Sequence, residues 1–355
     1  MATKNSINLK STEDEEIKKY AEKTKIKIKV VGCGGAGSNT VSRITEMNLQ
    51  NVETIAINTD ALDLLYTQAN KKILIGKETT KGFGAGADIL LGRKAAEEQK
   101  EDIKNAIKGA DLIFLTAGLG GGTGSSSIPV VANIAKDLNI MSVAIVTLPF
   151  FMEGRHRAEN AKVSLEELEK YVDTLIIIQN ERLLEIAPNL TLAEAFKFAD
   201  EILSNAVKGI VDVVNRPGLI NVDFADLKTI LKEGKFGVIG IGESDSEKRA
   251  IEAAQKAVSH PLLKIDIKNG KAALIDIISD PSLTVKESQK VIETISSHLS
   301  EDSKIIWGVQ LDKNLNGKIK VICVITGLEK PEYFKIKTLK KKKEIESYLG
   351  VEIVE

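Results

Sequence analysis

The feature that most constrains this chain is a glycine-rich stretch, residues 118–124, in which five of seven residues are glycine. It lies between an apolar, strand-like segment (residues 111–116) and an apolar segment that we expect to be helical from about Ile128. Glycine lets a backbone approach another group closely and adopt positive φ. A helix that begins after such a turn offers free N–H groups and the positive end of its dipole to an anion. Flexible linkers do not lie between a buried strand and its helix, so the stretch predicts a phosphate site, with Thr123, Ser125 and Ser126 as additional hydroxyl donors.

Two more glycine-rich turns follow strand-like segments, at residues 32–39 and 82–88. The first matches the GxGxxG pattern of dinucleotide-binding folds, and Asp60 ends the next predicted strand, where such a fold binds a ribose hydroxyl. A dinucleotide-dependent oxidoreductase is therefore one interpretation. One dinucleotide needs one such turn, however, and three turns at the ends of different strands instead predict a mononucleotide whose phosphates are bound from several sides.

Alternating strand-like and helical segments predict an α/β fold, with a Rossmann-like parallel sheet in the first half of the chain. After it, residues 191–215 carry apolar side chains three and four apart, which predicts one long helix of about 37 Å between two domains. The segment beyond this helix predicts a smaller α/β domain without a phosphate loop. In chain order, the predicted units are an N-terminal extension with a charged helix (1–25), a nucleotide-binding domain (26–190), a connecting helix (191–216), the second α/β domain with the loop that precedes it (217–327) and a tail (328–355).

Composition excludes several classes of protein. The formal net charge of −1 argues against a general nucleic-acid binder. Two cysteines, Cys33 and Cys323, are too few for a disulfide framework or a zinc site, which predicts a reducing cytosol. No apolar run approaches the roughly 18 residues of a membrane span, and the N-terminus lacks the apolar core of a signal peptide. We therefore expect a cytoplasmic protein with no direct membrane span.

Three residues with reactive or aromatic side chains are interpreted as structural. Cys33, inside a glycine-rich turn, is expected to be a small packing residue rather than a redox thiol. His156 has cationic neighbours and no carboxylate partner in sequence, so we expect it to be exposed. Trp307 is expected in the core.

Two aspartates, Asp223 and Asp226, are three residues apart at the start of a predicted helix and therefore share one of its faces. Acidic residues at such positions often cap the helix and offset its dipole. A carboxylate pair on one face can also act in catalysis. Spacing alone leaves both interpretations open.

Together these motifs resemble the FtsZ family, the tubulin-like GTPases of prokaryotic cell division, over about residues 26–327. Residues 120–125 are similar to the signature loop of the tubulin/FtsZ family, which differs from a Walker A motif because no lysine-serine or lysine-threonine pair follows. One departure is Ser126, at a position where the signature usually ends in glycine. We expect its side chain to affect the rate of hydrolysis rather than nucleotide binding. The tail is more similar to that of archaeal than of bacterial members.

The resemblance implies GTP or GDP as the ligand, with Mg2+ beside it. In this family, Glu153 and Arg157 match the residues that contact sugar and phosphate, and Asn180 and Asp200 match those that recognise guanine. The full set of implied nucleotide contacts is Gly34, Gly35, Ala36, Gly37, Ser38, Asn39, Asn58, Asp60, Gly84, Ala85, Gly86, Ala87, Gly121, Gly122, Thr123, Gly124, Glu153, Arg157, Asn180 and Asp200.

The resemblance also implies a function for the aspartate pair. Asn221, Asp223 and Asp226 match the loop that completes the active site of the neighbouring subunit. The implied protein is a polymerising GTPase that forms head-to-tail filaments and the cytokinetic ring at mid-cell. A nucleotide-binding regulator with little turnover is the alternative.

The expected partners are further copies of the chain and a membrane-anchoring division protein that binds the C-terminal tail. Residues 335–343 of that tail carry six lysines and no acid before an apolar-acidic end. Such a pattern fits either a solvated segment or a docking tag.

Overall fold

The computed structural model describes residues 26–182, 189, 191–215, 219–220, 222–259 and 267–331. The expected N-terminal helix, Asn221 and the lysine-rich tail segment lie outside the described residues.

One ten-stranded sheet runs through the molecule in the order β3-β2-β1-β4-β5-β6-β7-β10-β8-β9. The first six strands are parallel, as predicted, and near-continuous runs of buried Ile, Val and Leu fit a sheet that is covered on both faces. Their bounds are β1 Ile28–Cys33, β2 Val52–Asn58, β3 Lys71–Leu74, β4 Leu112–Gly118, β5 Met141–Leu148 and β6 Thr174–Gln179.

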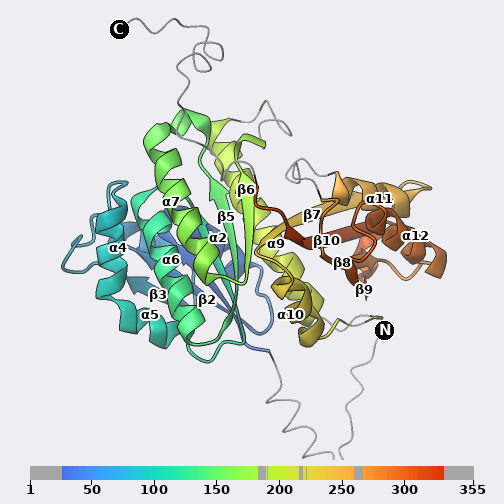
Figure 1. Ribbon diagram of the computed structural model, residues 1–355, viewed down its shortest axis with the longest axis horizontal. Helices are drawn as coiled ribbons and strands as arrows, with labels where there is room; N and C mark the ends of the chain where they lie inside the picture. Colours follow the sequence, from blue (N-terminus) through green and yellow to red (C-terminus); the bar gives the residue numbers. More distant parts are fainter. Residues whose placement is uncertain are drawn as a thin grey trace, which may run out of the picture.

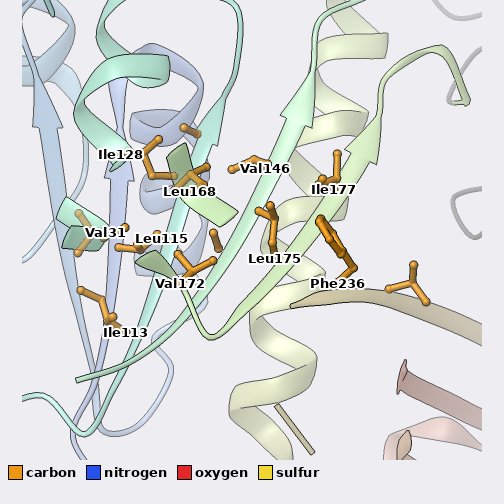
Figure 2. Close-up of a cluster of buried hydrophobic side chains, with 14 of the residues drawn as sticks. Val31, Ile113, Leu115, Ile128, Val146, Leu168, Val172, Leu175, Ile177 and Phe236 are labelled. Atoms are coloured by element: carbon orange, nitrogen blue, oxygen red, sulfur yellow. The ribbon is translucent and has the colours of Figure 1, made fainter. Parts of the chain in front are cut away.

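Helices cover both faces of this sheet and enclose two large cores (Figure 1). One core joins the sheet to four helices of the first half of the chain, and Figure 2 shows a part of it that includes Leu115, Ile128 and Leu168. Those helices are α4 Ile89–Glu98, α5 Lys100–Ile107, α6 Gly122–Asp137 and α7 Arg155–Tyr171. The other core lies under α2 Gly34–Glu46, α3 Ala61–Tyr66, α9 Leu192–Asn215 and α10 Phe224–Lys232.

The long helix predicted for the middle of the chain is α9, which runs between the two halves of the molecule (Figure 1). Its start is fixed by a reciprocal capping box: Thr191 Oγ1 accepts from the Glu194 backbone N–H (3.3 Å), and the Glu194 carboxylate accepts from the Thr191 N–H (2.8 Å). Among the described residues, no helix is both long and apolar enough to cross a membrane.

The second half of the chain continues the same sheet. β7 joins β6 in parallel through Leu175↔Phe236 and Ile176↔Gly237, and β10 pairs antiparallel with β7 and β8. The smaller α/β unit predicted after α9 is therefore present and extends the first sheet. Its elements are β7 Phe236–Ser244, α11 Arg249–Val258, β8 Ala272–Ser279, α12 Val285–Ser296, β9 Lys304–Leu311, the 3-10 turn Lys313–Leu315 and β10 Ile319–Leu328.

Helix α6 begins six residues earlier than the apolar pattern predicted, at Gly122 instead of about Ile128. The prediction followed the apolar pattern, which begins at about Ile128, and glycine is a poor helix former, so the glycines at 122 and 124 gave no signal of an earlier start. Tertiary contacts override this preference. A Cβ at position 122 would lie 2.9 Å from the Asp88 backbone N, so only glycine lets the first turn of α6 lie against the loop before α4.

Candidate active site

A cavity of about 470 Å3 opens where the parallel strands end. Ligands of open α/β sheets bind at this edge, because the loops after the strands meet there. Fourteen of the predicted contact residues line it: Gly34, Gly35, Ala36, Asn39, Gly86, Ala87, Gly121, Gly122, Thr123, Gly124, Glu153, Arg157, Asn180 and Asp200. The lining also includes Gly118, Leu119, Thr147, Pro149, Phe196 and Ala199.

Two helix N-termini meet at one end of the cavity. Gly34, with φ of +70°, begins α2, and a Cβ on it would lie 2.8 Å from the Gly124 backbone N in the first turn of α6. Glycine is therefore required for the two helices to approach this closely. Their free N–H groups and dipoles provide a positive region suited to a phosphate group.

Hydroxyl groups fix the shape of the signature loop. The Gly120 N–H donates to Ser125 Oγ at 2.7 Å, and the hydroxyls of Thr59 and Thr123 share a hydrogen bond of 2.6 Å. Ser126, the departure from the usual signature, donates to the Gly122 carbonyl oxygen at 2.6 Å. Its hydroxyl is accommodated because position 92 on α4 is glycine, where a Cβ would lie 2.4 Å from Ser126 Oγ.

Asn180 and Asp200 also line the cavity. Asn180 is 5% exposed, and its Oδ1 has no hydrogen-bond partner among the described residues, as expected for a group that a ligand completes. Burial raises the pKa of Asp200 to about 6, while the charge of Arg43 and a hydrogen bond from Asn39 oppose this increase. A carboxylate accepts two hydrogen bonds and can pair with the adjacent N1–H and amino group of guanine, whereas adenine presents an acceptor at N1.

The loop after β5 forms a third wall. Glu153 forms an ion pair with Arg157 and accepts the Phe150 N–H at 2.8 Å. The Phe150 ring packs edge-on against Phe196 of α9, with 5.4 Å between ring centroids. This contact ties the loop to the start of α9. Phe196 was not predicted as a site residue, and its only signal was its position four residues before Asp200 on one helical face.

Six predicted contact residues do not line the cavity: Gly37, Ser38, Asn58, Asp60, Gly84 and Ala85. Several of them support the walls from behind. Asn58 Oδ1 accepts the Thr59 N–H at 2.8 Å, and Asp60 caps α3 by accepting the Leu62 and Asp63 N–H groups. A direct contact between these six residues and a nucleotide stays a prediction.

The structural interpretations of Cys33 and His156 are confirmed. Cys33 is fully buried, and burial raises the pKa of its thiol to about 12, so the thiol is unreactive at neutral pH. His156 is exposed.

Asp223 and Asp226 are not part of this cavity. Asp223 caps α10, with its Oδ1 accepting the Asp226 N–H at 2.7 Å. Helix α10 follows the C-terminal end of α9, whereas the α9 residues in the cavity are near its N-terminus (Figure 1). The 15 residues of α9 between Asp200 and Asn215 alone span about 22 Å.

The segment before α10 is held by the second half of the sheet. The Leu219 N–H donates to the Val309 carbonyl oxygen at 2.7 Å, and the Val309 N–H donates to the Ile220 carbonyl oxygen at 3.1 Å. These bonds attach the segment to the edge strand β9. Beside it lies an apolar groove of about 420 Å3 whose lining includes Leu219, Val285 and Trp307. The prediction that Trp307 lies in the core is confirmed only in part: Trp307 packs against the first core but is half-buried, because β9 is an edge strand.

A mononucleotide-sized cavity bounded by glycine-rich helix N-termini, on one sheet crossed by a long central helix, defines a tubulin-like GTPase. Residues 27–188 match the model of the Tubulin/FtsZ family, GTPase domain. Residues 236–329 match the model of the FtsZ family, C-terminal domain. The chain belongs to the FtsZ family, the GTP-binding proteins of prokaryotic cell division.

Known relatives agree with this assignment. The chain is 50% identical over 333 residues to "Cell division protein FtsZ 1" of Methanocaldococcus jannaschii, covering 94% of this chain and 92% of the relative. It is 49% identical over 346 residues to the protein of the same name from Thermococcus kodakarensis, covering 98% and 91%. The structure superimposes on an M. jannaschii FtsZ dimer subunit with a TM-score of 0.84 and 51% identity, covering 90% of this chain and 93% of that one. CetZ2 of Haloferax volcanii, 22% identical, shares the fold alone, with a TM-score of 0.77 over 87% of this chain and 97% of that one.

Proposed function

We propose that this chain is an assembly-dependent GTPase that builds the cytokinetic ring, and that each active site is completed by the Asp223 loop of the next subunit. The observation that carries the proposal is the position of the carboxylates relative to the cavity. Among the described residues that line the cavity, the only carboxylates are Glu153, which is ion-paired, and Asp200, at the base end. The cavity therefore offers groups to bind a nucleotide but no free carboxylate at the phosphate end to act on water.

The aspartate pair supplies what the cavity lacks. Asp223 is exposed, and only its Oδ1 is used in the capping bond to Asp226. A carboxylate has a second oxygen, so Asp223 can cap α10 and still orient and polarise a water molecule. Capping and catalysis, which the sequence left as alternatives, are compatible roles. Asn221 and Asp226 would act beside it in the same loop.

Exposed apolar side chains support head-to-tail contact. Near the cavity, Phe83 is 89% exposed and Phe151 is 82% exposed. Beside the Asp223 loop, Leu219 is 72% exposed and Val285 is 88% exposed. Large exposed apolar side chains gathered at two different places suit a contact between unlike surfaces, which propagates as a filament.

Within one junction, the N–H groups of residues 34–36 and 121–124 would bind the phosphates and stabilise the charge that develops during transfer to water. Hydrolysis to GDP and phosphate would then weaken the junction. Mg2+ usually binds one or two carboxylates and the substrate phosphates. The described residues contain no group of three or more His, Cys, Asp or Glu that could hold a metal, so the phosphates would supply most of its ligands. Asp63 lies near Gly35 but outside the residues that line the cavity, and its Oδ2 accepts from Asn58 Nδ2 at 2.6 Å.

We place the ring at mid-cell in the cytoplasm, with a membrane-anchoring division protein bound to the C-terminal tail. Deletion of residues 335–355 tests this partner. The shortened protein should assemble normally and fail to bind its anchor, and unchanged localisation in cells would contradict the docking role.

GTP hydrolysis measured against protein concentration tests the proposal. The expected specific activity rises above a threshold concentration, because a completed site needs two subunits. Asp223→Ala should bind GTP and not turn it over. Specific activity that is independent of concentration would mean that one chain holds a complete site. Binding without turnover at any concentration would favour the regulator instead.

A further inference from the structure

Asn160 on α7 connects two of the glycine-rich loops from behind the cavity. Its side chain is 5% exposed, and its Nδ2 donates to the Ala87 carbonyl oxygen at 2.9 Å and to the Gly120 carbonyl oxygen at 3.2 Å. Asn160 does not line the cavity, whereas Ala87 and Gly121 do. One buried amide group therefore holds the backbone of two walls at once.

Both carbonyl groups belong to residues with unusual backbone conformations. Gly120 has φ of +110°, and Ala87 has φ of +64°, which is uncommon for a residue with a Cβ. The peptide between Gly120 and Gly121 has glycine on both sides, so little steric resistance opposes its rotation. A specific hydrogen bond is then the main means of fixing its orientation.

The orientation of that peptide decides what it offers to a ligand. In a trans peptide, the carbonyl and the following N–H point in opposite directions. Because Asn160 holds the Gly120 carbonyl away from the cavity, the Gly121 N–H points toward it. If the peptide turned over, it would present a carbonyl oxygen to a phosphate, and repulsion would replace a hydrogen bond.

We propose that Asn160 is a positioning residue that keeps the Gly121 N–H directed at the phosphates and holds the loops at Ala87 and Gly120 at a fixed separation. The inference rests on the proposed function, since it assigns the phosphate end of the same cavity. In the described part of the chain, no other side-chain amide of α7 donates a hydrogen bond to these two loops.

The test compares Asn160→Leu with Ser164→Ala in the full-length protein. Leucine has a similar size and no donor. Ser164 lies one turn further along α7, is equally buried, and its Oγ has no hydrogen-bond partner among the described residues, so its loss should leave the loops unchanged. Equilibrium titration with a fluorescent N-methylanthraniloyl-GTP measures affinity. Hydrogen exchange of the ligand-free proteins reports on the hydrogen-bonded amides of the two loops, Asp88, which donates to the Ala85 carbonyl oxygen, and Gly120, which donates to Ser125 Oγ.

For Asn160→Leu, we expect affinity to fall by about 10- to 100-fold, the effect of losing a hydrogen bond to a charged group. Exchange at Asp88 and Gly120 should accelerate while the strands keep their protection. Asn160→Ala, which also removes the donor and adds no bulk or charge, should show the same loss and decides the case if the leucine variant does not fold.

Unchanged affinity in a folded Asn160 variant would overturn the inference alone. Loss of affinity together with faster exchange throughout the sheet would also overturn it, because it would indicate a general structural role. A wild-type chain that does not bind the analogue would overturn the proposed function as well.

Discussion

Acidification should weaken GTP binding through Asp200. Burial raises the pKa of this carboxyl to about 6. Guanine presents donors at N1 and at its amino group, so binding favours the ionised carboxylate and releases a proton when the group is protonated. The affinity for GTP should therefore be highest above the pKa of Asp200 and should fall as the pH drops through that pKa.

The magnitude follows from the fraction of ionised Asp200. If only the carboxylate form binds guanine, a pKa of about 6 makes the apparent Kd about 2-fold larger at pH 6 and about 11-fold larger at pH 5 than at pH 8. The assay is fluorescence titration with N-methylanthraniloyl-GTP across this range. The phosphates of the nucleotide also titrate near pH 6, so a control is needed.

Asp200→Asn is that control, because its side chain does not titrate. It should bind GTP about 10- to 100-fold more weakly at pH 8 and lose the Asp200 part of the slope. It should also favour xanthosine triphosphate relative to GTP, since an amide can donate to the 2-oxo group of xanthine. Equal slopes in the two proteins would refute the assignment of Asp200 to guanine.

Three further substitutions test other parts of the structure. Gly34→Ala should lower Tm and abolish GTP binding, because its Cβ would lie 2.8 Å from the Gly124 N at a φ of +70°. Calorimetry measures the change in Tm and titration measures GTP binding. A stable variant that binds GTP would contradict the close packing of α2 against α6. Leu219→Lys should raise the protein concentration needed for assembly in light scattering without changing GTP affinity, whereas Val163→Lys, at an exposed site on α7, should leave assembly unchanged. Thr191→Ala should lower the free energy of unfolding by about 1 kcal/mol, the usual effect of losing an N-cap, and an unchanged denaturant midpoint would count against the capping box.

Local patterns predicted most elements of the fold. Apolar spacing identified α9, and glycine-rich turns at strand ends identified the edge of the sheet where the cavity lies. The failures share one cause, which is contact between distant residues. The start of α6 at Gly122 depends on packing against the loop before α4, and the partial exposure of Trp307 depends on strand order.

The site was predicted in part for the same reason. Residues that carry a local signal, such as the glycines of residues 121–124, line the cavity. The hydrogen bonds of Asn160 have no such signal, and Phe196 has only its spacing from Asp200, because each joins elements that are remote in sequence. The resemblance to a family, not the spacing of Asp223 and Asp226, provided the expectation that they act on a neighbouring subunit.

Mixing two inactive variants tests that shared site most directly. Asp223→Ala keeps an intact cavity, and Asp200→Lys keeps an intact Asp223 loop. Because each site draws on two subunits, a mixture forms junctions in which an intact cavity meets an intact loop. Random pairing at equal concentrations gives up to about a quarter of the wild-type GTPase rate. We expect such recovery on mixing. A mixture no more active than its separate components, although both variants enter the same polymer, would contradict a site shared between subunits.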